Sequence, residues 1–175
     1  MQSIKLSQKE LREALDLAAQ RHEAKHVSVR DTGPRMTSKY KTALVNFIGD
    51  VRYKPHFLGL LGEMAYAKAT GGEVNKEIYN RGDDHTGDVG RVEVKTSTWM
   101  GPDIDLKITQ REVDEIDNQP EKYALMRVNE SNFSNVEFIG EISRDDFIKK
   151  AVKKRYKAGY PMNYILDGRK LAQSI

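Results

Sequence analysis

Apolar residues recur at helical spacing in three segments of the chain. Ser7 to Glu10 has the form of a capping box, and apolar residues follow it three or four positions apart over 11–18. This pattern predicts an amphipathic helix that ends near residue 25. The segment 55–69 begins with proline and is followed by two glycines, the residue types favoured just inside the start and just past the end of a helix. A weaker pattern over 40–48 predicts a further short helix.

Alternation of apolar and polar residues indicates strands in the second half of the chain. Residues 92–96 read Val-Glu-Val-Lys-Thr, so the valines share one face of a predicted strand and Glu93 and Lys95 share the other. Two later stretches, 123–128 and 136–142, are also predicted to be strands.

Ser143 has the position of an N-cap, and the apolar residues after it recur at helical spacing. This predicted apolar stripe consists of Phe147, Ile148, Ala151 and Val152. The order of elements along the chain predicts an α/β fold in which helices flank a mixed central β-sheet. A length of 175 residues is that of one ordinary domain. We therefore expect residues 1–175 to form a single domain with an N-terminal helical segment at about 7–50.

Composition narrows the classes of function. The hydrophobic fraction of 38% and the charged fraction of 31% are typical of a globular protein. No apolar run approaches the roughly 20 residues of a membrane helix, and the first residues do not form a signal peptide, so we expect a cytoplasmic protein with no membrane partner. The absence of cysteine excludes disulfides and thiolate metal sites. Any metal would be bound by carboxylates or by histidines.

Two carboxylates are predicted to meet at a tight turn. Gly90 and Arg91 suit a two-residue hairpin turn, because glycine tolerates a positive φ. Asp88 would then lie opposite Glu93, about 5 Å away on the same face, and Lys95 shares that face. Carboxylates this close repel each other unless they share a cation, and magnesium prefers such oxygen ligands. The pattern therefore predicts magnesium-assisted phosphodiester hydrolysis, in which Lys95 positions or helps deprotonate the attacking water.

The helix residue Glu63, followed by Asp88 and by the Glu93-x-Lys95 pair, resembles the motif of the PD-(D/E)XK nuclease superfamily. The resemblance covers a motif core of about residues 56–100. It implies a restriction-endonuclease-like fold and a magnesium- or manganese-dependent endo- or exodeoxyribonuclease. It also implies that Glu63, Asp88 and Glu93 bind the metal and that Lys95 completes the catalytic set. DNA is the implied partner, a bacterial or phage-infected cell is the implied setting, and a homodimer is one option.

The aspartate of the motif has rivals in the same stretch of sequence. Only four residues separate Asp88 from Glu93, fewer than the motif usually has, and the proline that precedes the aspartate in the motif is missing. Asp83 and Asp84 are the alternatives. Asp84 has the more typical spacing, but pairing it with Glu93 would centre the turn on Asp88 and Val89, which suit a tight turn less well. We therefore favour Asp88.

Two other functions compete with the nuclease interpretation. Residues 22–26 form a literal H-E-x-x-H string, His22-Glu23-x-x-His26, the signature of zinc metallopeptidases. Arg21 and Lys25 interrupt its apolar surroundings, which argues against this interpretation. The other alternative is a nuclease-fold protein that binds nucleic acid without turnover. The intact motif acids argue against it, because a cluster of like charges is costly without a metal.

Basic residues gather in two places that suit nucleic-acid phosphates. One is the basic segment 149–157, where each neutralised phosphate would add salt-dependent affinity, with a solvated helix face as an equal alternative. Its main candidates are Lys150, Lys153 and Lys154. The other place holds Lys107 and Arg111, beside a predicted N-cap at Thr109, although a solvated surface is the preferred interpretation there. Trp99 follows the predicted strand 92–96, where a base contact is conceivable and a position in the core is favoured.

Overall fold

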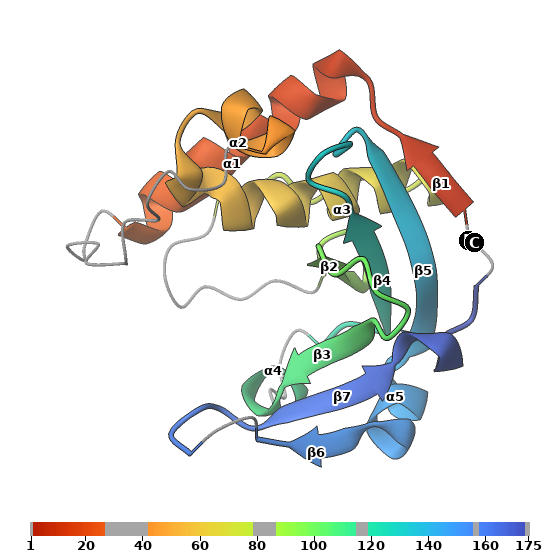
Figure 1. Cartoon of the computed structure of the whole chain (residues 1–175). Helices are drawn as coiled ribbons and strands as arrows, with labels where there is room; N and C mark the ends of the chain where they lie inside the picture. The colour runs from red at the N-terminus through yellow and green to blue at the C-terminus, as the bar shows by residue number, and fades with distance from the viewer. Residues whose placement is uncertain (1, 27–41, 79–86, 115–118, 156–157, 174–175) are drawn as a thin grey trace.

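The computed structural model describes residues 2–26, 42–78, 87–114, 119–155 and 158–173. In this part of the chain a four-stranded sheet has the strand order β1-β5-β4-β2 (Figure 1). Its strands are β1 (Gln2–Lys5), β5 (Asn135–Ser143), β4 (Lys122–Val128) and β2 (Val92–Ser97). β2 and β4 are parallel, whereas β5 is antiparallel to both β4 and β1. The sheet is therefore mixed, as the α/β prediction required.

Two long helices cover one face of this sheet (Figure 1). α3 (Lys54–Thr70) contacts all four strands, and α1 (Gln8–His26) packs on α3. α1 begins with the predicted capping box, in which the Ser7 amide donates to Glu10 Oε2 at 2.6 Å and the Glu10 amide donates to Ser7 Oγ at 3.3 Å. α3 ends at Gly71, whose left-handed backbone (φ 72°) favours glycine. Both predicted helices are confirmed.

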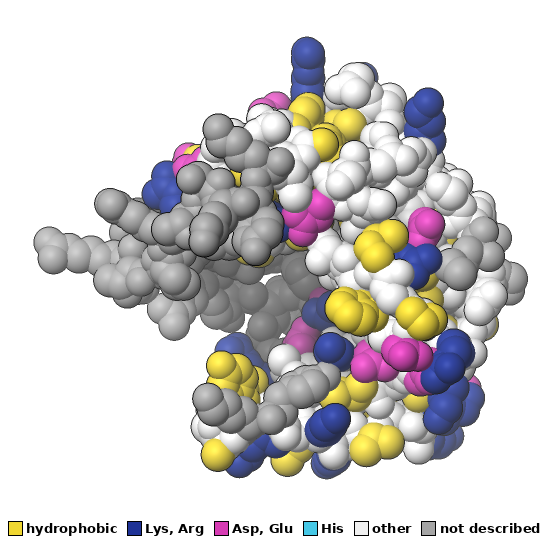
Figure 2. All heavy atoms as spheres, in the orientation of Figure 1, with side chains coloured by type: hydrophobic (Ala, Val, Ile, Leu, Met, Phe, Trp, Pro, Cys, Tyr) yellow, Lys and Arg dark blue, Asp and Glu magenta, His cyan; other side chains and the backbone are white. Residues whose placement is uncertain are grey.

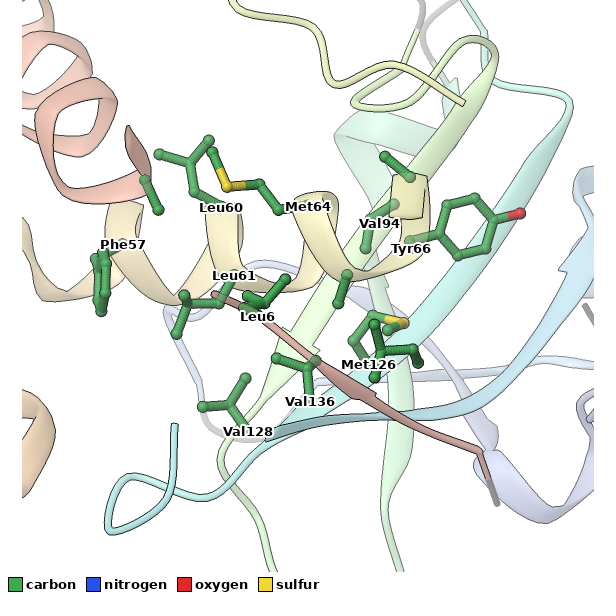
Figure 3. Packing of buried hydrophobic residues seen from close by; sticks show 14 of the residues in the cluster. Leu6, Phe57, Leu60, Leu61, Met64, Tyr66, Val94, Met126, Val128 and Val136 are labelled. Carbon is green, nitrogen blue, oxygen red and sulfur yellow. The ribbon is translucent and has the colours of Figure 1, made fainter. Parts of the chain in front are cut away.

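The weaker helical pattern corresponds to α2 (Ala43–Ile48), where Thr42 Oγ1 accepts a hydrogen bond from the Val45 amide at 3.2 Å. A 3-10 turn, η1 (Val51–Tyr53), then leads directly into α3. Apolar side chains from the helices and the sheet form the first core (Figure 3). Its buried members include Leu6, Phe57, Leu60, Leu61, Val94, Met126, Val128 and Val136. No helix in the described ranges is long and apolar enough to cross a membrane.

A smaller antiparallel sheet has the order β3-β7-β6 and builds the second part of the molecule (Figure 1). It consists of β3 (Asp105–Thr109), β7 (Asn163–Asp167) and β6 (Val152–Lys154), and is accompanied by α4 (Gln110–Asp114), α5 (Arg144–Lys150) and η2 (Gly168–Lys170). Tyr123 and Leu125 of β4 belong to the core under this sheet, whereas Ala124 and Met126 belong to the first core. β4 is thus buried on both faces, which explains its continuous apolar run.

The helix predicted after Ser143 is shorter than its apolar pattern indicated. α5 begins as expected, because Ser143 Oγ accepts a hydrogen bond from the Asp146 amide at 3.2 Å, but it ends at Lys150. Ala151 has extended backbone angles, and Val152 pairs with Ile165 of β7. Val152 is 67% exposed, so its assignment to an apolar helix stripe was wrong. Strand pairing overrides the helical pattern at this point.

Candidate active site

Glu63 lies in the buried middle of α3 and is only 5% exposed. Arg21 of α1 donates from Nη1 to both carboxylate oxygens of Glu63, at 3.2 and 3.1 Å. The Nη2 atom of Arg21 donates to the carbonyl oxygen of Asn75 at 2.6 Å. A buried carboxylate needs this kind of hydrogen-bonded cation, since an isolated charge is costly to bury. The helix therefore presents Glu63 together with a neutralising guanidinium.

The predicted turn forms at Gly90 and Arg91. Val89 and Val92 exchange backbone hydrogen bonds of 3.1 and 3.0 Å across it, and Gly90 has a φ of 59°. A left-handed backbone of this kind is the reason why glycine suits the position. The turn brings the segment before it alongside the free edge of β2, which is the outermost strand of the four-stranded sheet.

Asp88 is placed differently from the prediction. Its backbone amide and that of Val89 both donate to the carbonyl oxygen of Val92, at 2.9 and 3.1 Å. Asp88 thus lies beside Val92 and not opposite Glu93. Its side chain is buried, and Oδ2 accepts a hydrogen bond of 2.8 Å from the Val94 amide. This bond fixes the carboxylate at the edge of β2.

Glu93 and Lys95 lie close together on β2, as the alternating pattern predicted. Lys95 Nζ donates to Glu93 Oε1 at 2.7 Å and to Glu112 Oε1 at 2.5 Å. Glu112 belongs to α4, and its Oε2 accepts bonds from the amide (2.9 Å) and the hydroxyl (2.6 Å) of Thr109. Sequence reasoning recognised Thr109 as an N-cap but missed Glu112. A glutamate three residues after the cap completes a capping box, so this signal was present, whereas its contact with Lys95 depends on the tertiary fold.

The three acids of the motif affect one another electrostatically. Burial and then the charge of Asp88 raise the pKa of Glu63 to about 8, and Glu93 adds to the rise. Arg21 opposes this rise because it stabilises the charged carboxylate. Glu63, Asp88 and Glu93 therefore occupy one electrostatic neighbourhood, although they come from a helix, a turn and a strand.

Lys95 carries a stabilised positive charge. Burial alone would lower the pKa of Lys95, but attraction by Glu93 and Glu112 raises it above the ordinary value. Burial would likewise raise the pKa of Glu112, but the charge of Lys95 and the hydrogen bonds to it and to Thr109 lower it. Lys95 is thus an ammonium ion at neutral pH. It suits the stabilisation of negative charge or the orientation of a water molecule better than the removal of a proton.

The acids have the right chemistry for a hard divalent cation, but each of them already has a protein partner. Within the described ranges, no group of three or more histidine, aspartate or glutamate side chains is arranged to hold a metal ion. Arg21 engages Glu63, Lys95 engages Glu93, and the Val94 amide engages Asp88. Three carboxylates fit the oxygen preference of magnesium or manganese, provided that Arg21 and Lys95 shift. Metal binding at these acids stays a prediction.

The rival residues lie largely outside the described part of the chain. Asp83 and Asp84 fall within 79–86, and the side chain of His26 is also outside the described residues. His22 is buried, and its ring packs edge-on against Tyr53 and His56, with centroid distances of 5.4 and 5.7 Å. The choice between Asp84 and Asp88 and the zinc hypothesis stay untested.

A cleft of about 370 Å³ lies beside Lys95, and Trp99 and Lys107 contribute to its walls. Figure 2 shows a hollow between the helical part of the molecule and the part formed by the small sheet, with basic and acidic side chains around it. Trp99 is 60% exposed, so the expectation that it belongs to the core was wrong. Arg111 is exposed on α4. The basic segment is exposed too, at Lys150 of α5 and at Lys153 and Lys154 of β6.

Comparison of the chain with protein-family models, curated proteins and solved structures finds no match.

Proposed function

We propose that this chain is a metal-dependent nuclease of the PD-(D/E)XK type that hydrolyses phosphodiester bonds in DNA. The observation that carries the proposal is that the three motif acids act on one another: burial and then the charge of Asp88 raise the pKa of Glu63, and Glu93, which is paired with Lys95, adds to the rise. Burial of carboxylates with perturbed pKa values is typical of functional sites. The setting would be the cytoplasm of a bacterial or phage-infected cell, and a homodimer would allow one site to act on each DNA strand.

Each residue has a distinct role in this proposal. Glu63, Asp88 and Glu93 would hold magnesium or manganese, which when bound supplies charge stabilisation at the phosphate and a water of lowered pKa. Without the metal, Arg21 is hydrogen-bonded to Glu63, and with the metal bound it would be able to donate to a phosphate oxygen instead. Lys95, held between Glu93 and Glu112, would orient the attacking water or stabilise the charge on the scissile phosphate.

A second candidate is a protein of this fold that binds nucleic acid without turnover. It is favoured by one observation, namely that Arg21 and Lys95 already neutralise Glu63 and Glu93. In such a protein the ion pairs would be purely structural. The two candidates make opposite predictions for cleavage in magnesium.

Cleavage by Glu93→Ala and Lys95→Ala variants tests the nuclease proposal. Glu93→Ala should abolish cleavage and weaken Mn²⁺ binding measured by calorimetry, because a ligand is lost. Lys95→Ala should retain Mn²⁺ binding but lose cleavage, because the charge next to the reacting phosphate is lost. Both variants should still bind DNA. Calcium should support binding without turnover in the wild type, since it fits octahedral geometry poorly.

Lys68→Ala is the matched control, because Lys68 also forms an ion pair, with Glu10, but at an exposed position near the C-terminal end of α3. It should cleave like the wild type. Full cleavage by either active-site variant, or wild-type cleavage in a chelating buffer, would exclude this mechanism. Failure of the wild type to cleave any DNA in magnesium or manganese would favour the binding protein.

A further inference from the structure

Trp99 is the only tryptophan of the sequence, and it is 60% exposed in the loop between β2 and β3. Met100 beside it is 49% exposed. A tryptophan normally buries its large apolar ring in a core or an interface. Neighbouring exposed apolar side chains therefore mark a surface that meets another molecule.

The position of the indole ring is fixed by its own loop. The Trp99 amide donates to Ser97 Oγ at 3.1 Å. The ring lies directly against Gly101, because a Cβ added at Gly101 would come within 2.7 to 2.9 Å of indole atoms Nε1, Cε2 and Cζ2. Glycine at this position lets the ring rest on the backbone while much of it stays exposed. The aromatic surface is thus presented in a defined place.

This ring lines the same cleft as Lys95. The cleft measures about 370 Å³, near the lower end of the range for small-ligand pockets, which suits a single flat ligand group and not a whole double helix. It is lined by Lys95, Thr96, Ser97, Trp99, Asp103, Asp105, Lys107 and Leu125. The lining therefore combines two lysines, Lys95 and Lys107, with the aromatic face of Trp99.

The acidic members of the cleft restrict what can lie against Trp99. Asp103 and Asp105 repel a phosphate, so a charged group is favoured only near Lys95 and Lys107. A neutral planar ring is compatible with the rest of the cleft. An unpaired nucleobase attached to a phosphodiester combines both groups, and bases stack on aromatic side chains irrespective of sequence.

We propose that Trp99 is a stacking platform for an unpaired base next to the scissile phosphate, so that the substrate is DNA with single-stranded nucleotides at the cleavage site. This inference rests on the proposed nuclease function. In a continuous duplex each base is already stacked and paired, and reaching Trp99 would require it to leave the helix. Single-stranded or locally unpaired DNA presents its bases without this cost.

The fluorescence of Trp99 gives a direct test, because no other tryptophan contributes to the signal. A short oligo(dT) is titrated into the wild-type chain in calcium buffer, and a duplex of the same length is titrated in parallel. Binding of each DNA is followed independently by the anisotropy of a label on the DNA. Oligo(dT) should quench the tryptophan emission in proportion to binding, and the duplex should leave it nearly unchanged at equal saturation.

Variants separate stacking from general affinity. Trp99→Ala should weaken oligo(dT) binding by roughly 5- to 150-fold, with a smaller effect on the duplex, and Trp99→Phe should give an intermediate loss. Tyr160→Ala is the control, because Tyr160 is 57% exposed and does not line the cleft. It should change neither affinity. Thermal unfolding should show that all three variants fold, since both rings are largely exposed.

The outcomes for stacking and for the nuclease function are distinguishable. Absence of quenching by bound oligo(dT), failure of oligo(dT) to bind, or an equal loss for both DNAs in Trp99→Ala would overturn the stacking proposal, even if the wild type cleaves DNA in magnesium. Quenching of the wild-type emission by bound oligo(dT), with the selective loss of oligo(dT) affinity in Trp99→Ala but no cleavage of any DNA in magnesium or manganese, would retain the base platform and reject the nuclease.

Discussion

Arg21 and Lys95 are the two cations that make the acidic cluster tolerable without a metal. Glu63, Glu93 and Lys95 were foreseen from the sequence, because a motif on a predicted helix and strand identifies them. Arg21 was not, since it lies 42 positions before Glu63 and on another helix. No pattern in the neighbouring sequence indicates a contact between residues so far apart in the chain. The candidate acids and Lys95 were thus identifiable from the sequence pattern, and Arg21 was not.

The raised pKa of Glu63 predicts how the stability of the metal-free chain depends on pH. The folded-state pKa of about 8 lies above the ordinary value of 4.5, so between these values the folded state binds more protons than the unfolded state. The stability that Glu63 contributes is fully present below about 4.5 and is lost as pH rises through about 8. Urea unfolding at about pH 5 and about pH 9 should show this loss, on the order of a few kcal/mol.

Glu63→Gln is the comparison for this pH dependence, because it keeps the size of the side chain and cannot titrate. Its unfolding free energy should fall less between the two pH values than that of the wild type. An identical dependence in both proteins would mean that Glu63 is ionised alike in the folded and unfolded states.

Glu112 is predicted to position Lys95 in the active site. Glu112→Gln keeps an oxygen that can accept the Thr109 bonds but removes the charge that raises the pKa of Lys95. Cleavage should fall on the order of tenfold, and its decline at high pH should begin at a lower pH, because Lys95 loses its proton more easily. Asp114→Asn on the same helix, where Asp114 accepts a bond from Gln110 at 2.7 Å, should change neither. An unaltered pH profile in Glu112→Gln would leave only a capping role.

At the level of elements, three strands of the larger sheet were predicted and the other strands were missed. Apolar residues mark β2, β4 and β5 in the sequence, and the structure confirms these strands. β6 has three exposed residues and β1 has one buried residue among four, so neither shows a hydrophobic signal. β7 alternates between half-buried and buried positions and could have been found. The predicted position of Asp88, opposite Glu93, was wrong. Its side chain accepts a hydrogen bond from the Val94 amide, and the alternation of residues along a strand does not indicate a bond of this kind.

The packing of α3 on β2 depends on the absence of a side chain at Gly62. A Cβ there would lie 2.0 Å from Thr96 Oγ1 and 3.3 Å from the Cβ of Met126. Gly62→Ala should therefore destabilise the fold by about 1–3 kcal/mol, because helix and sheet must separate. Thr96→Ala should restore part of this loss in the double variant. Chemical denaturation measures both.

Gly59→Ala provides the control on the same helix. An added Cβ at Gly59 would have Glu63 Oε1 as its nearest neighbour, at 3.6 Å, which is an ordinary contact. Alanine is the better helix former, so this variant should be stabilised by roughly 0.5–1 kcal/mol. Similar effects at the two glycines would show that the contact with Thr96 does not limit the packing.

For the molecule as a whole, both the larger sheet with its helices and the part built around the small sheet contribute residues to the proposed function. The helical layer and the four-stranded sheet provide Glu63, Asp88 and Glu93, whereas β3 and α4 provide Lys107 and Glu112. The α/β class and the flanking helices followed from the order of predicted elements. The second sheet did not, because its strands are short and β3 pairs with β7 across more than fifty positions. The cleft exists only through this long-range pairing.

The basic segment extends the second part of the molecule with exposed lysines, and we predict that it binds DNA phosphates. Combined replacement of Lys150, Lys153 and Lys154 by alanine should weaken DNA binding irrespective of sequence. The slope of log affinity against log salt should become shallower by roughly 2 to 3, if each lysine neutralises one phosphate.

The matched control replaces three lysines of the helical layer and its flank, Lys9, Lys68 and Lys76. Either triple variant lowers the net charge from +3 to 0, so a general charge effect would appear in both. The position-specific interpretation requires a change in the basic-segment variant alone, and an unchanged slope there would show that these lysines form only a solvated surface.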